Sequence, residues 1–177
     1  MTSLFTIAEE IRKCTACPLF KKRMVAVAGE GKEKAKVLFI SSAPNKDEDR
    51  LAKLLVNKQG KFFNQLLKSL NLTREDIYLT SALKCHLPSS YSLTNKEVKT
   101  CKNLWLDPQI ELLQPKIIVL LGSLALRSVL KTSNIKKYHG TLIKSKYFVT
   151  YNPQAAFKSQ KIKEILIEDF KKLRKLL

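Results

Sequence analysis

The chain has 177 residues, a length that fits one domain of ordinary size. Hydrophobic residues make up 45% of it, which is enough to build a buried core and excludes an intrinsically disordered chain, and no apolar run is long enough to cross a membrane. The 33 Lys and Arg residues outnumber the 15 Asp and Glu residues and give a net charge of +18, which favours a polyanionic partner such as nucleic acid over general solubility in a lysine-rich proteome.

Apolar periodicity predicts that helices and buried strands alternate along the chain. Thr94, with Glu97 three residues later, forms a capping box that starts a helix at residue 95, and Ser123 is the expected N-cap of a later helix. In chain order, the predicted elements are a helix over 2–12, a strand over 36–40, a helix over 62–70, a strand over 77–80, a helix from 95, a short helix over 109–113, a strand over 115–122, a helix up to 130, a strand over 147–151 and an amphipathic helix over 161–177 that turns Leu177 inward.

This order of elements predicts an α/β fold in which helices cover both faces of a central, mainly parallel sheet of four strands. We expect a single domain over residues 1–177, because no linker or repeat divides the chain. In such a sheet, binding sites form where the strands end at their carboxyl edge. The loops that begin at Ser41, Ser81, Gly122 and Asn152 are therefore the candidate site.

Four cysteines form a second candidate site. Residues 1–10 lack the segments of a secretory signal, so we expect an intracellular protein, in the cytoplasm or nucleoid if the source is prokaryotic, with reduced thiols. Cys14 and Cys17 form a C-x2-C pair that can hold one metal centre from a single turn, while Cys85 and Cys101 come from a strand end and a helix. Four thiolates suit a [4Fe–4S] cluster or a zinc ion, and spacing alone does not separate these from four unrelated thiols.

Several segments, taken in order, resemble the iron–sulfur uracil-DNA glycosylases, family four of that superfamily. They include Arg-Lys-Cys-Thr-Ala-Cys-Pro-Leu at 12–19, Leu-Thr-Arg-Glu-Asp-Ile-Tyr-Leu-Thr at 72–80, Leu-Lys-Cys at 83–85 and Leu-Gln-Pro-Lys-Ile-Ile-Val-Leu-Leu-Gly at 113–122. The resemblance covers nearly the whole chain. It implies a three-layer α/β/α fold of the uracil-DNA glycosylase type. It also implies a [4Fe–4S] cluster that positions DNA, with zinc as the alternative, held by Cys14, Cys17, Cys85 and Cys101.

The polar positions of the family's pocket motifs differ in this chain. The family's Gly-Glu-Ala-Pro-Gly matches residues 41–45, Ser-Ser-Ala-Pro-Asn, so that Ser42 stands where the family has a carboxylate. Ungapped matching places a leucine at the family's stacking Phe, a serine at the Asn that reads the uracil edge, and Asn-Pro at the final His-Pro. The resemblance thus assigns Ser42, Asn45 and Asn152 to catalysis, and Ala43, Pro44, Leu55, Ser81 and Pro153 to the base pocket.

Other polar and aromatic residues near these motifs have alternative interpretations. Phe62 and Phe63 could replace the stacking aromatic, but their helical spacing favours the core. His86 and His139 occupy no family motif and are expected at the surface or facing DNA. The acids at 47–49 are either a solvated turn or a substitute for the water-binding carboxylate.

The resemblance implies a DNA repair protein that removes uracil or another deaminated base from single- or double-stranded DNA by hydrolysing the N-glycosidic bond. The alternative is a catalytically impaired or inactive homologue that acts as a DNA-binding or assembly protein. A nucleotide-binding α/β protein is disfavoured, because the chain lacks a Gly-rich phosphate loop. We expect a monomer without membrane association, with replication or repair proteins as further partners.

Overall fold

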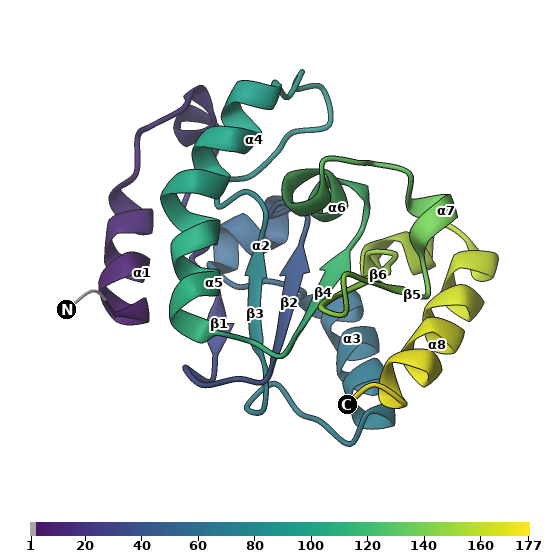
Figure 1. The fold of residues 1–177 in the computed structure, drawn as a ribbon. Helices are drawn as coiled ribbons and strands as arrows, with labels where there is room; N and C mark the ends of the chain where they lie inside the picture. The colour runs from purple at the N-terminus through teal and green to yellow at the C-terminus, as the bar shows by residue number, and fades with distance from the viewer. Residues whose placement is uncertain (1–2) are drawn as a thin grey trace.

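The computed structural model describes residues 3–177, which form three layers with a six-stranded sheet in the middle (Figure 1). The strand order is β1-β3-β2-β4-β6-β5, and the four central strands are parallel. The predicted three-layer fold with four parallel strands is therefore confirmed. The strands are β1 Glu30–Gly31, β2 Val37–Ser41, β3 Tyr78–Ser81, β4 Ile117–Leu121, β5 Thr141–Ile143 and β6 Tyr147–Thr150.

The two edge strands, β1 and β5, pair antiparallel to their neighbours and were not predicted. They are only two and three residues long and largely exposed, so neither carries an apolar run. The predicted helices occur in the predicted order, and two further short helices, α2 and α7, were not predicted. They are α1 Leu4–Lys13, α2 Lys46–Leu51, α3 Asn57–Ser69, α4 Asn95–Cys101, α5 Asp107–Leu113, α6 Ser123–Leu130, α7 Ile135–Tyr138 and α8 Gln160–Arg174, with a π-turn over Lys102–Leu106 and 3-10 turns over Pro18–Lys22 and Pro153–Phe157.

Side chains of the parallel strands alternate between two hydrophobic cores, because successive residues of a strand point to opposite faces. Phe39 of β2 packs on one face against Phe63 of α3 and Phe170 of α8, at centroid distances of 5.2 and 6.2 Å. Leu38 and Ile40 pack on the other face with residues of α1, α5 and α6. Phe62 and Phe63 both lie in the first core, as predicted.

Helix ends show one confirmed prediction and two corrections. The capping box of Thr94 and Glu97 is present at the start of α4. Ser123 is not an N-cap. It is the first residue of α6, whose N-cap is Gly122, and no side chain caps that end. The terminal helix ends at Arg174, so Leu177 lies beyond it and is 52% exposed instead of facing inward. Within residues 3–177, no helix has the length and apolar character needed to span a membrane.

Candidate functional site

The carboxyl ends of the parallel strands lie at one level of the sheet. Ser41 at the end of β2 is in register with Ser81 at the end of β3, and Leu121 of β4 is in register with Thr150 of β6. Ile40, one residue before Ser41, pairs with the residue before Leu121. The four loops named from the sequence therefore leave the sheet along the same edge, as the parallel arrangement predicts.

Three of those loops meet at what we call the carboxyl-edge cluster, formed by Ser41, Ser42, Gly122 and Asn152. The Nδ2 atom of Asn152 donates a hydrogen bond of 3.1 Å to the Oγ atom of Ser41. A Cβ atom placed on Gly122 would lie 3.1 Å from Ser42 Oγ and 3.3 Å from Asn152 Cβ, and the φ angle of Gly122 is +96°. Glycine is required here, because both the positive φ and the close approach disfavour a larger residue.

The polar atoms of the carboxyl-edge cluster are only partly used within the protein. Ser42 Oγ donates to the carbonyl oxygen of Leu121 at 3.2 Å, which leaves its lone pairs as acceptors. Asn152 Oδ1 accepts from the backbone N–H of Gln154 at 2.9 Å and thereby caps the following 3-10 turn. A side-chain amide carries two N–H groups, so Asn152 keeps one donor beyond its bond to Ser41. The cluster can thus offer one N–H donor and one hydroxyl acceptor to a ligand.

Asn45 has a structural role in the first motif. Its Oδ1 atom caps α2 by accepting from the backbone of Asp47 and Glu48, and its Nδ2 atom donates to Gln59 Oε1 at 3.1 Å. Asn45 therefore joins the starts of α2 and α3. Ala43 is half-buried and Pro44 is buried, and the Pro44 carbonyl oxygen lies 3.0 Å from His86 Nδ1.

The acids of α2 tie surrounding loops together. Glu48 is 3% exposed and accepts from the backbone N–H groups of Asn45 and Leu55 at 2.8 and 2.7 Å. Asp49 is equally buried and accepts from the backbone of residues 24 and 25. Burial raises the pKa of Glu48, against the opposing effect of its two backbone donors. The solvated-turn interpretation holds for Asp47, which is exposed, and is wrong for Glu48 and Asp49.

Four of the five residues assigned to the base pocket are buried, and two of them, Leu55 and Ser81, have their side chains fully used within the protein. Leu55 is 2% exposed and belongs to the first hydrophobic core, with a φ angle of +48°. Ser81 is fully buried, and its hydroxyl donates to the carbonyl oxygen of Leu83 at 2.7 Å. Neither side chain presents a free surface to a base. Pro153, also buried, begins the 3-10 turn that follows Asn152.

Sequence patterns placed Ser41 at the start of a candidate loop but assigned it no role in the site, and they predicted only a surface or DNA-facing position for the two histidines. Ser41 is 2% exposed and bonds directly to Asn152, and its place at a strand end was the only available signal. His86 lies against the first motif through Pro44. His139 is half-buried, and its Nδ1 atom lies 3.3 Å from both carboxylate oxygens of Asp169. These contacts join residues far apart in the sequence, so no local pattern could reveal them.

The four cysteines, which we call the thiol cluster, come from separate elements. Cys14 ends α1, Cys17 precedes the first 3-10 turn, Cys85 follows β3, and Cys101 is the last residue of α4. All four are free thiols; Cys85 and Cys101 are buried, and the other two are half-buried. Across residues 3–177, no three His, Cys, Asp or Glu side chains form a ready-made site for a metal ion.

Nitrogen donors face two sulfur atoms of the thiol cluster. The guanidinium of Arg23 donates to Cys85 Sγ at 2.9 Å, and the indole N–H of Trp105 donates to Cys14 Sγ at 3.3 Å. A thiolate accepts such bonds better than a neutral thiol, because an ionised acceptor strengthens a hydrogen bond. These contacts, with four soft sulfur atoms in one region, fit a centre held by thiolates.

Burial raises the pKa of three thiols in the structure. The pKa of Cys101 rises to about 11, and those of Cys17 and Cys85 also rise. Negative charge on the neighbouring sulfurs raises each pKa further, whereas Arg23 lowers that of Cys85. The four thiols are thus close enough to influence one another. Metal binding would have to displace their protons, since only the thiolate is a ligand.

A buried lysine lies beside the thiol cluster. Lys84 is 1% exposed, and its ammonium donates to Thr80 Oγ1, the Ser81 carbonyl oxygen and Gln109 Oε1 at 2.6–2.8 Å. Burial lowers its pKa to about 8. Because Lys84 directly precedes Cys85, this network connects the end of β3 with the thiol cluster.

Comparison with known proteins extends over nearly the whole chain. A family model described as the uracil DNA glycosylase superfamily matches residues 28–174. A type-4 uracil-DNA glycosylase of Sulfurisphaera tokodaii is 36% identical over 189 residues, covering 99% of this chain and 86% of that protein. One from Archaeoglobus fulgidus is 34% identical, covering 99% and 94%. A DNA polymerase of Bacillus phage SP01 is 30% identical over 84% of this chain, which corresponds to 16% of the polymerase.

Proposed function

We propose that this chain is a DNA repair enzyme that removes uracil or another deaminated base by hydrolysing the N-glycosidic bond. The chain belongs to the uracil DNA glycosylase superfamily and is similar to type-4 members of that superfamily. The observation that carries this proposal is the meeting of Ser42, Gly122 and Asn152 at the carboxyl edge of the sheet. Hydrolysis of this bond needs a donor for the leaving base and an acceptor for water in one place, and this cluster supplies both kinds of group.

The spare N–H of Asn152 is suited to stabilise the leaving base. A base inside a duplex is out of reach, so the enzyme must first rotate it out of the stack. As the bond breaks, negative charge develops on the uracil oxygens, and a donor already in position stabilises it. The bonds of Asn152 to Ser41 and to Gln154 fix the amide before the base arrives. We therefore assign the oxyanion donor to Asn152.

The lone pairs of Ser42 are suited to orient the attacking water. Its hydroxyl proton is directed to the Leu121 carbonyl oxygen, so the oxygen can accept a hydrogen from water. A hydroxyl is a much weaker base than a carboxylate, and general-base catalysis contributes about 10²–10⁴-fold in rate. We expect excision to be slower than a carboxylate at this position would allow.

The other residues assigned to the pocket have two different roles: some surround the base, and others pack behind those residues. We propose Ala43, Pro44 and Pro153 as the wall around the base, because they flank the carboxyl-edge cluster in the two loops that form it. We propose that Leu55 and Ser81 support this wall from inside, given their burial. The structure gives Asn45 a capping role, so its part in catalysis is to position the first motif.

DNA is the substrate that the family implies, and the net charge of +18 supports binding to its phosphates. Four properties remain predictions: action on single- or double-stranded DNA, a monomeric state, one domain over residues 1–177 and an intracellular location. The similarity to part of a phage DNA polymerase supports a replication protein as a further partner.

We also propose that Cys14, Cys17, Cys85 and Cys101 hold a [4Fe–4S] cluster, with zinc as the alternative. Such a group would tie together the three parts of the chain that carry these cysteines, and the family resemblance implies that it would thereby position DNA. The nitrogen donors of Arg23 and Trp105 support a thiolate centre. Iron, sulfide and zinc should be quantified in protein purified without oxygen. A colourless protein with stoichiometric zinc and no iron would contradict the cluster.

A second function, DNA binding without excision, is favoured by one set of contacts. The polar groups of Ser81 and Asn45 are bonded within the protein, and Leu55 is buried in the core. A pocket that has lost these groups could bind DNA and no longer cleave the glycosidic bond.

The two functions are separated by an excision assay on a panel of substrates. Oligonucleotides with one uracil, hypoxanthine, xanthine or mismatched thymine, single- and double-stranded, are incubated with the holoprotein and abasic sites are scored. Abasic sites from at least one deaminated base support the enzyme. Binding to all of them without excision supports the second function.

A further inference from the structure

A cavity of about 570 Å³ opens at the amino edge of the sheet, opposite the carboxyl-edge cluster. Val37 and Ile117, the first residues of β2 and β4, are paired in register and line it. The ends of two helices complete it, with Leu70 after α3 and Arg174 at the end of α8. We call this cavity the amino-edge groove. Its size falls within the range of ligand-binding clefts.

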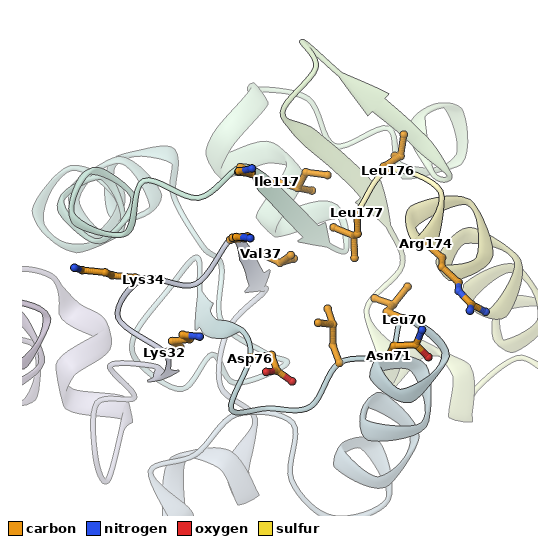
Figure 2. A pocket seen from close by; sticks show the side chains of 13 residues that line it. Lys32, Lys34, Val37, Leu70, Asn71, Asp76, Ile117, Arg174, Leu176 and Leu177 are labelled. Atoms are coloured by element: carbon orange, nitrogen blue, oxygen red, sulfur yellow. The ribbon is translucent and has the colours of Figure 1, made fainter.

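The interior of the amino-edge groove is aliphatic. Val37, Leu70 and Leu177 point towards the hollow in Figure 2. Leu176 and Leu177 are 41% and 52% exposed, so apolar surface remains open to solvent at the mouth. None of the residues that line the groove is aromatic. The groove can therefore take up apolar side chains but offers no ring on which a base could stack.

The rim of the groove carries an excess of positive charge. Five cationic residues line the groove against one acidic side chain, that of Asp76. Lys32, Lys34 and Arg174 lie around its margin in Figure 2. Among residues 3–177, none of the five cationic side chains forms an ion pair. The cations are Lys32, Lys34, Lys36, Lys116 and Arg174.

The one acidic side chain of the groove is ionised and held in place. Asp76 accepts from both the backbone N–H and the hydroxyl of Thr73 at 2.8 Å, and these bonds lower its pKa. This carboxylate repels phosphates and peptide carboxylates alike, so it does not decide between them. The aliphatic floor without an aromatic ring is what favours a polypeptide over a nucleic acid as the occupant.

We propose that the amino-edge groove docks an acidic peptide segment of a partner protein, with its carboxylates on the lysine rim and one or two large apolar side chains on the aliphatic floor. Charge complementarity selects the acidic residues and steers the encounter. Burial of the peptide's apolar side chains on the floor supplies the affinity. A charged phosphate placed against the same aliphatic floor would lose its hydration without compensation. Nucleic-acid sites for single strands use aromatic platforms, which this groove lacks.

The groove faces away from the carboxyl-edge cluster, since Val37 and Ser41 are the opposite ends of the same strand. A strand of five residues spans about 13–17 Å, which separates the two sites. A peptide in the groove would thus leave the carboxyl edge free for DNA. The proposal adds a tethering site to the protein and does not depend on its excision activity.

The test uses the fluorescent peptide Asp-Glu-Leu-Asp-Glu-Leu-Phe and measures its binding to the holoprotein by anisotropy. Two control peptides replace either the apolar residues by Ser or the acidic residues by Lys. The groove variant is K36E/K116E, and the matched control is K131E/K136E, which changes the net charge equally. All four lysines are exposed, so both variants should fold. A third variant, Leu177→Ser, alters the apolar mouth without changing charge.

We expect the acidic apolar peptide to bind and both control peptides to bind much more weakly. K36E/K116E should lower the affinity at least about tenfold more than K131E/K136E, because reversed charges act strongly only at short range. Leu177→Ser should also weaken binding, while uracil excision by the two double variants should be equal. The proposal is overturned if the probe does not bind, if the Ser-substituted peptide binds equally well, or if a thymidine 12-mer displaces the probe and its own affinity follows the groove variant.

Discussion

The thiol cluster and the carboxyl-edge cluster differ in how far their side chains resemble the family pattern. All four cysteines of the first are present, and nitrogen donors face two of the sulfurs. The second has serine hydroxyls and the Asn152 amide where the family resemblance implies a carboxylate and an imidazole, while Gly122 and the strand ends still bring its loops together. The comparison teaches that backbone geometry can persist where side-chain chemistry has changed.

The largest expected effect is the loss of metal when one cysteine of the thiol cluster is replaced. Cys101→Ala removes one of four proposed ligands, so the ratio of metal to protein should fall to background, because the remaining thiolates cannot complete the coordination. Val98→Ala in the same helix and the same apolar cluster is the control, since it creates a cavity without removing sulfur. Metal analysis after desalting measures both. Full metal retention by Cys101→Ala would remove Cys101 from the ligand set.

The second largest expected effect is a lower rate of excision when Asn152 of the carboxyl-edge cluster is replaced. Asn152→Ala should lower the single-turnover rate of uracil excision by about 10²–10³-fold, the loss typical of one oxyanion donor. Asn45→Ala is the matched control, because its amide caps α2. It should cost about 1 kcal/mol of stability and change the rate much less. Equal rate losses in the two variants would contradict the assignment of the donor to Asn152.

Some features of the fold and of the candidate site could be predicted from the sequence, and others could not. The central strands, the capping box and the order of elements followed from periodicity and spacing, because each is a local pattern. The burial of Leu55 and Ser81 could not be predicted in this way, since Leu55 packs into a core built from distant elements and the Ser81 hydroxyl bonds to Leu83 only in the folded loop. The role of Gly122 also required the fold, because residues 42 and 152 approach it from distant strands.

A smaller effect is expected from the buried acid of α2. Glu48→Ala leaves the backbone N–H groups of Asn45 and Leu55 without their acceptor, so the free energy of unfolding should fall by about 2 kcal/mol. Asp47→Ala, at an exposed neighbouring site, should change it by less than about 0.5 kcal/mol. Chemical denaturation measures both. A loss of excision in Glu48→Ala without a loss of stability would instead make Glu48 a direct participant.

The smallest effect is a pH dependence at the same residue. Burial raises the pKa of Glu48, so the folded state binds this proton more tightly than the unfolded state does. The protonated Glu48 side chain therefore contributes to the free energy of unfolding fully below the pKa of the unfolded state, about 4.3, and this contribution is lost as the pH rises through the pKa of the folded state. The unfolding free energy of the wild type minus that of Glu48→Gln should decrease across this range. An increase would mean that the backbone donors outweigh burial.

The central claim is that the carboxyl-edge cluster still performs chemistry despite its altered side chains. The most direct measurement is single-turnover excision of uracil from a single-stranded oligonucleotide by the metal-loaded protein, with binding to the same oligonucleotide measured in parallel. We predict abasic sites that accumulate in a single exponential phase and are absent with a thymine-containing control strand. Saturated binding without abasic sites would contradict the claim and leave a DNA-binding protein with an inactive pocket.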